Sequence, residues 1–155
     1  NWDVSSVTNI SEMFGVSNFN QPIGNWDVSN VTNMNFLFGY NTQFNQPIEN
    51  WDVSNVISMD NTFRDSNFNQ PIGNWDVSNV EIMWGMFFRN RKFNQDISNW
   101  DVSNVINMNG MFGDTTFNQD LSNWNVINVT GCSEFSFGNK VWTLPKPNFT
   151  NCNSN

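Results

Sequence analysis

The sequence predicts a leucine-rich-repeat-like solenoid of about six repeats, each with one short parallel β-strand and one short helical turn. Three observations predict it: a tryptophan recurs every 24 or 25 residues, Phe-Asn-Gln recurs with it, and the apolar positions within each copy keep one spacing. The tryptophans are Trp2, Trp26, Trp51, Trp75, Trp100 and Trp124. A single copy cannot bury its apolar face, whereas stacked copies can, so a solenoid is the expected architecture.

The predicted strand covers residues 25–29 of the second copy, where apolar and polar residues alternate. We expect Trp26 and Val28 to face the core and the polar residues around them to face outward. The tryptophans from Trp26 to Trp100 should be largely buried, and each should stack on the tryptophan of the next copy.

The predicted helical turn covers residues 31–38, and Ser29 or Asn30 is its natural N-cap. Apolar residues stand at spacings of three, three and one, which suits a short helix with one buried face. The methionine and phenylalanine columns that this spacing creates are interpreted as core packing rather than as cofactor ligands.

The connectors follow at 15–18, 39–43, 64–67, 88–92 and 113–116, and their lengths alternate between four and five residues. Insertions of this kind map to surface loops on one face of a repeat array. Four of the six cationic residues lie in these connectors, namely Arg64, Arg89, Arg91 and Lys92. We interpret them as candidates for an assembly contact with a neighbouring subunit.

The two ends of the chain differ. Residues 1–138 form the predicted array, and residues 139–155 leave its pattern and are predicted to form a C-terminal cap. No corresponding cap precedes Trp2. We therefore expect the region from Trp2 to Phe14 to be covered by further residues or by another chain.

Composition excludes several classes of function. Among 155 residues there are 6 Lys+Arg, 14 Asp+Glu and no His, so the formal net charge is -8. This balance argues against nucleic acid and against anionic membrane surfaces as partners. The absence of histidine removes the commonest general base and metal ligand. No apolar run approaches the roughly 18 residues of a membrane span, and the aromatic content of 15% argues for a folded chain.

The run Phe19-Asn20-Gln21-Pro22-Ile23-Gly24-Asn25-Trp26-Asp27-Val28-Ser29-Asn30-Val31-Thr32-Asn33-Met34 resembles a known repeat of roughly 25 residues. That repeat, a domain of unknown function, occurs in mycoplasma and listeria surface lipoproteins and in algae, other protists and large DNA viruses. The run is also similar to treponemal-type leucine-rich repeats. The resemblance implies a curved solenoid and an adhesion or structural protein at a cell or virion surface. It implies no catalytic residues.

One column of carboxylates runs through the array: Asp3, Asp27, Asp52, Asp76 and Asp101. Stacked carboxylates could collect Ca²⁺, a cationic glycan or a basic partner. The alternative, which we favour, is that each aspartate accepts local hydrogen bonds and recurs only because the unit recurs. A regular ladder offers no unique carboxylate pair for glycoside hydrolysis. We therefore predict neither an enzyme nor a resident metal or cofactor, with Ca²⁺ left as an alternative.

Cys132 replaces a methionine of the repeat and Cys152 lies near the end of the chain. In a secreted protein an even pair favours a disulfide, and the alternative is two free thiols. The glycosylation candidates are Asn148, Asn30 and Asn128, of which Asn148 lies outside the array.

Together these observations predict a non-enzymatic, acidic repeat protein that is extracellular or on a virion. It would bind a protein or a glycan in adhesion, or alternatively build a surface layer, fibre or capsid from neighbouring subunits.

Overall fold

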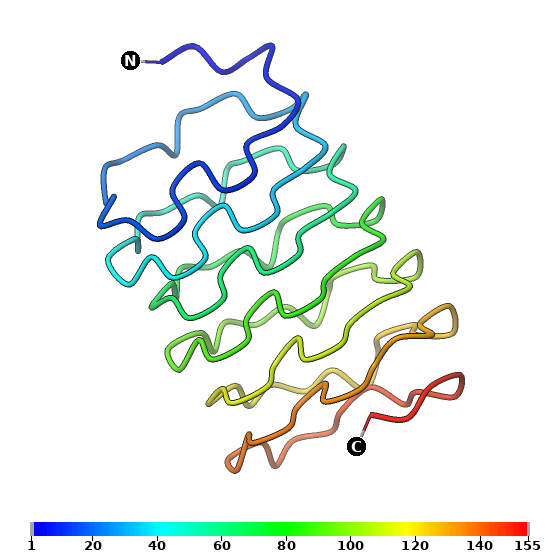
Figure 1. Ribbon diagram of the computed structural model, residues 1–155. Coiled ribbons are helices and arrows are strands. Elements are labelled where there is room, and N and C mark those ends of the chain that lie inside the picture. The colour runs from blue at the N-terminus through cyan, green and yellow to red at the C-terminus, as the bar shows by residue number, and fades with distance from the viewer. Residues whose placement is uncertain (1, 155) are drawn as a thin grey trace.

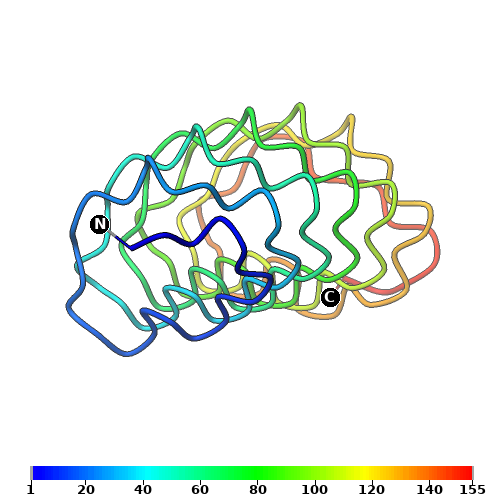
Figure 2. The ribbon, with the colours of Figure 1, turned by 90° about the horizontal axis from the view of Figure 1, so that it is seen from above.

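A computed structural model describes residues 2–154 and shows a chain that winds as a stack of similar coils (Figure 1). Seen from above, successive coils lie over one another along the whole chain (Figure 2). Within the described residues there is no helix, and β-pairing is reduced to isolated parallel bridges. The bridged residues are Asn9, Asn33, Ser58, Ile82, Asn107 and Gly131. The predicted leucine-rich-repeat-like solenoid, with a strand and a helical turn in each repeat, is therefore wrong.

The segment predicted as a helical turn is a succession of tight turns, because its amide groups alternate between two kinds of acceptor. Every second N–H donates to a carbonyl of the following coil, as from Phe36 to Asp60 at 2.8 Å. The intervening N–H groups donate three residues back, as from Leu37 to Met34. An α-helix instead needs each amide to donate four residues back. The backbone bonds that a helix would keep inside one repeat here join one coil to the next.

Backbone dihedrals exclude the helix as well. Phe36 and Tyr40 have φ values of 58° and 57°, and the equivalent residues of the other coils are also in the left-handed region. In a β-turn such as that from Met34 to Leu37, a positive φ at the third residue is typical of type II. Left-handed residues placed four apart cannot belong to a right-handed helix. The three-residue spacing between buried side chains therefore arises here from consecutive β-turns.

The segment predicted as a strand keeps its facing pattern but not its pairing. Val28 is buried, Trp26 is half-buried, and Asp27 between them is exposed. A side-chain amide joins the coils here, because Asn55 Nδ2 donates to the Ser29 carbonyl at 2.8 Å. The parallel bridge forms farther along the chain, at Asn33.

Two ladders of phenylalanine rings run through the core. Each of the first five coils contributes a face-to-face pair, such as Phe38 and Phe44 with ring centroids 3.8 Å apart. Along the array, Phe38 stacks on Phe63 at 5.7 Å and Phe44 on Phe68 at 6.1 Å. Such pairs stabilise by about 0.5–1.5 kcal/mol beyond their burial. Of the predicted tryptophan stacks, Trp100 on Trp124 is present at 6.3 Å, whereas the Trp51 and Trp75 rings pack on Phe38 and Phe63.

The last coil ends the ladders. Trp142 meets the Phe117 ring edge-on at 4.9 Å, in place of the face-to-face contacts of earlier coils. The tail then passes back along this coil, with Phe149 against Phe135 and Lys146 Nζ donating to Ser136 Oγ. The tail thereby covers one end of the stack. Within the described residues, no helix has the length and apolarity that crossing a bilayer requires.

The alternation of 24 and 25 residues has a structural cause in a column of polar residues, which are buried at Asn41, Ser66, Asn90 and Thr115. In the five-residue connectors an asparagine holds this position, at Asn41 and Asn90, and Asn139 takes the same place in the last coil. In the four-residue connectors it is occupied by Ser17, Ser66 and Thr115. Asn90 Nδ2 donates to Ser66 Oγ and to the Phe68 carbonyl, and its Oδ1 accepts the amides of Lys92 and Phe93. The structural unit is thus a pair of unlike coils.

Replacing Asn90 by alanine should lower the free energy of unfolding by about 2 kcal/mol, because four polar groups lose a partner where little water reaches. Asn55→Ala is the matched control, since Asn55 is exposed and makes one such bond between coils. Urea titration of both variants is the measurement. Equal losses in the two variants would contradict the role assigned to the buried amide.

Candidate functional site

The aspartate column lies on the surface, and its carboxylates are engaged locally. Asp27 Oδ1 accepts the Ser29 amide at 3.1 Å and the Ser29 hydroxyl at 2.6 Å. Asp52 repeats both bonds with Ser54. The same turn recurs at Asp3, Asp76 and Asp101. Within residues 2–154, no three His, Cys, Asp or Glu side chains gather into a group that could hold a metal ion.

These bonds change the acidity of several aspartates of the column. The hydroxyl and then the amide of the serine two residues on lower the pKa of Asp27, Asp52 and Asp101 below the ordinary value. A lowered pKa in the folded chain contributes stability above the unfolded value near 3.9. That stability is lost as the pH falls through the folded pKa. Burial raises the pKa of Asp60, so this residue acts in the opposite direction.

We therefore expect the urea midpoint to fall as the pH decreases below about 4. A variant with asparagine at Asp27, Asp52 and Asp101 should show a weaker fall. Asparagine suits the turn, because Asn125 occupies the same column and accepts the Ile127 amide. An unchanged pH profile in the triple variant would show that these carboxylates are not linked to folding.

Two of the four predicted basic connector residues meet on one carboxylate. Asp65 lies 3.2 Å from Arg89 Nε and 3.5 Å from Arg64 Nε. Arg89 remains about half exposed, whereas Arg64 is largely covered. Arg91 and Lys92 are exposed, and within the described residues neither forms an ion pair. The connectors thus divide into an anchored pair and a free pair of cations.

Aromatic side chains adjoin these cations. The Arg64 guanidinium lies between two rings, 5.8 Å from the centroid of Tyr40 and 4.8 Å from that of Phe88. Tyr40, Arg64 and Phe88 belong to three successive coils, so together they form a strip along the array, which we call the aromatic strip. Tyr40 is 42% exposed. Sequence reasoning missed Tyr40, Phe88 and the neighbouring Trp84.

A groove of about 330 Å³ opens beside the strip. Its lining residues are Arg64, Trp84, Gly85, Phe88, Asn109, Gly110, Ser133 and Glu134. Trp84 is 47% exposed. A Cβ on Gly113 would lie 2.7 Å from the Phe88 ring, so the absence of a side chain there allows Phe88 to lie flat. The groove therefore combines aromatic surface with amide, hydroxyl and charged groups.

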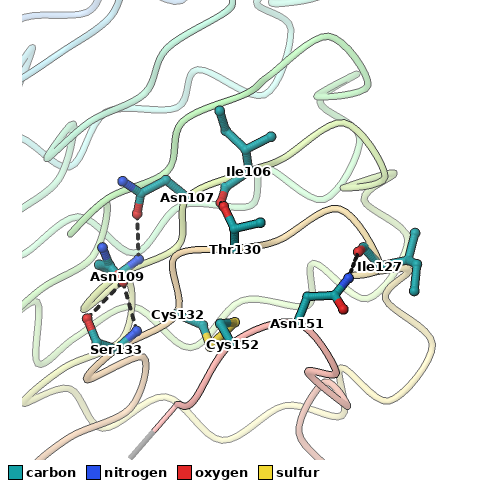
Figure 3. Close-up of a disulfide and its surroundings, with 9 residues drawn as sticks. All are labelled: Ile106, Asn107, Asn109, Ile127, Thr130, Cys132, Ser133, Asn151 and Cys152. Carbon is teal, nitrogen blue, oxygen red and sulfur yellow. Dashed lines mark hydrogen bonds between the residues drawn. A yellow bond between two sulfur atoms is a disulfide. The ribbon is translucent and has the colours of Figure 1, made fainter.

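The remaining predicted residues lie apart from this groove. Cys132 and Cys152 form the predicted disulfide, which fastens the tail to the last coil (Figure 3). Asn30 and Asn128 donate their side-chain amides to the carbonyls of Ser5 and Ser103. Asn148 is exposed on the tail. Of the three glycosylation candidates, Asn148 is thus the one whose modification would break no bond between coils.

Comparison with known proteins places the chain in a family. The search of curated proteins and the search of solved structures each gave no match. A family model described as "Mycoplasma protein of unknown function, DUF285" matches residues 1–83 and again residues 57–141. The two matches overlap and together span most of the chain, as a repeated motif requires. The chain therefore belongs to this family of mycoplasma proteins of unknown function.

Proposed function

We propose that this chain is a non-catalytic binding protein that acts in adhesion at a cell or virion surface. Its ligand surface is the aromatic strip with the adjoining groove and basic connector. The observation that carries the proposal is the exposed Trp84, which lines one groove with Arg64 and Phe88 of the aromatic strip. Tryptophan, tyrosine and arginine dominate the binding energy of recognition surfaces.

The position of these residues in the repeat supports the proposal. At the place of Trp84, other coils carry polar residues such as Asn35 and Asn109. At the place of Phe88, the first, second and fifth coils carry glycine. Packing of the array does not require large exposed rings there, so their presence favours a role in binding. The disulfide suits an oxidising, extracellular compartment.

Two ligand arrays test the proposal, and together they form the paired array: one carries immobilised glycans and the other immobilised extracellular proteins. The chain should bind at least one ligand class, and Tyr40→Ala combined with Trp84→Ala should abolish that binding. Ile106→Ala combined with Ile127→Ala is the matched control, because both isoleucines are exposed elsewhere on the array. Binding that survives the first pair or is lost with the second would overturn the assignment of the surface.

Assembly into a surface layer, fibre or capsid is the second candidate function. The exposed Arg91 and Lys92 favour it, because two cations that are unpaired within the described residues, on a chain with a net charge of -8, could contact the acidic surface of a neighbouring copy. Sedimentation velocity over a range of concentrations would detect self-association, and a constant monomer would exclude it for this chain.

A further inference from the structure

We infer that the ligand of the aromatic strip is an anionic glycan chain that lies along the array; this inference rests on the proposed function. The strip crosses three coils, with centroid-to-guanidinium distances of 5.8 and 4.8 Å. A ligand that follows it must therefore be extended. A folded partner would instead need a broad complementary face.

The chemistry of the surface selects a sugar over an extended peptide. A pyranose ring has a face of C–H groups and a rim of hydroxyls, so it matches an aromatic floor flanked by polar groups. The exposed Trp84 indole supplies the floor, and Asn109, Ser133 and Glu134 line the same groove. Asn109 Oδ1 accepts both the amide and the hydroxyl of Ser133 (Figure 3), which holds the amide in place.

Charge selects an anionic sugar. Arg64, Arg89, Arg91 and Lys92 are four of the six cations in a chain whose net charge is -8. Asp65 pairs with both Arg64 and Arg89, Asp60 also interacts with Arg64, and Glu134 lines the groove. Among the described residues Arg91 and Lys92 form no ion pair, so the uncompensated positive charge lies on the connector that follows Phe88. At physiological ionic strength charges beyond about 8 Å are screened, so a bound anion responds mainly to this local surface.

The surface is also held in shape before any ligand arrives. Tyr40 donates its backbone amide to the Arg64 carbonyl, and Asp65 donates its amide to the Phe88 carbonyl. Arg64 Nη1 donates to Asn61 Oδ1 at 3.2 Å. These bonds fix the strip across coils, and preorganisation reduces the entropy lost on binding.

Three immobilised polymers test the inference: dextran sulfate, neutral dextran and poly-L-glutamate, each at 0.15 M NaCl. Dextran sulfate should bind the chain at least about tenfold more tightly than either of the others. Trp84→Ala should weaken this binding about tenfold, as for a central aromatic contact. Arg91→Gln with Lys92→Gln should weaken it and reduce its dependence on salt.

The matched control is Thr42→Ala with Gln43→Ala, since these residues occupy the same connector positions two coils earlier. Equal binding to dextran and dextran sulfate would overturn the inference that the ligand is anionic. Equal binding to poly-L-glutamate and dextran sulfate would overturn the inference that it is a sugar. A protein as the sole ligand on the paired array would overturn the inference and leave the proposed function standing. No binding to any array or polymer would overturn both.

Discussion

Replacing Trp75 by alanine should lower the free energy of unfolding by about 3–5 kcal/mol, the range for removal of a large buried aromatic side chain. Trp75 is 4% exposed and packs against Phe63 at a centroid distance of 6.3 Å. Its indole Nε1 donates to the Ile48 carbonyl of the preceding coil at 3.1 Å. Alanine therefore leaves both a cavity and a buried carbonyl without its partner. Urea titration followed by circular dichroism measures the loss.

Trp84→Ala is the internal control for this prediction. Trp84 lies farther along the same repeat copy and is 47% exposed, so its removal should change the free energy of unfolding by less than about 1 kcal/mol. Because coils contact only their neighbours, Trp75→Ala should also broaden the unfolding transition, since one half of the stack unfolds first. Similar losses in the two variants would contradict the assignment of Trp75 to the core.

Reducing the disulfide should lower the free energy of unfolding by about 3 kcal/mol, the chain-entropy value for a loop of this size. Cys132 and Cys152 are separated by 20 residues, with Cα atoms 5.8 Å apart. Cys132 is buried, so the bond anchors the tail at the end of the core. Thermal unfolding with and without a phosphine reductant compares the disulfide-bonded and the reduced protein.

Hydrogen exchange locates the effect of reduction. Faster exchange should be confined to the last coil and the tail, where Phe149 and Lys146 make the contacts that the disulfide holds. Exchange in the second and third coils should not change, because the tail packs and hydrogen-bonds against the last coils, as at Ile127 and Phe135. Non-reducing peptide mapping that recovered two free thiols would refute the pairing.

Burial could be predicted from the sequence, whereas backbone conformation could not. Val31, Met34 and Phe38 are buried as the spacing predicts. A spacing of three is shared by a helix and by consecutive turns, so it identifies the buried face but not the element. The positive φ values at Phe36 and Tyr40 distinguish consecutive turns from a helix. Neither residue type favours that region. The backbone hydrogen bonds from Phe36 and Tyr40 to the next coil account for these positive φ values.

The candidate site was only partly predictable. The connectors identified Arg64 and Arg89, but the salt bridges to Asp65 depend on three-dimensional placement. The aspartate column was conspicuous because it recurs, yet recurrence reflects the repeating turn. The aromatic residues were missed because they do not recur. Comparing each copy with the others would have found Trp84, since a tryptophan at a position that is polar elsewhere has no role in stacking.

The pairing of unlike coils restricts how genes for such arrays can change length. Asn90 needs the Ser66 hydroxyl of the coil before it, and Asn41 likewise approaches Ser17. Unequal recombination that removes residues 41–89 joins Tyr40 to Asn90 and keeps every asparagine coil next to a serine or threonine coil. Loss of a single coil would place two coils of one kind together and leave an amide or a hydroxyl unmatched. Natural length variants of this array should therefore differ by even numbers of coils.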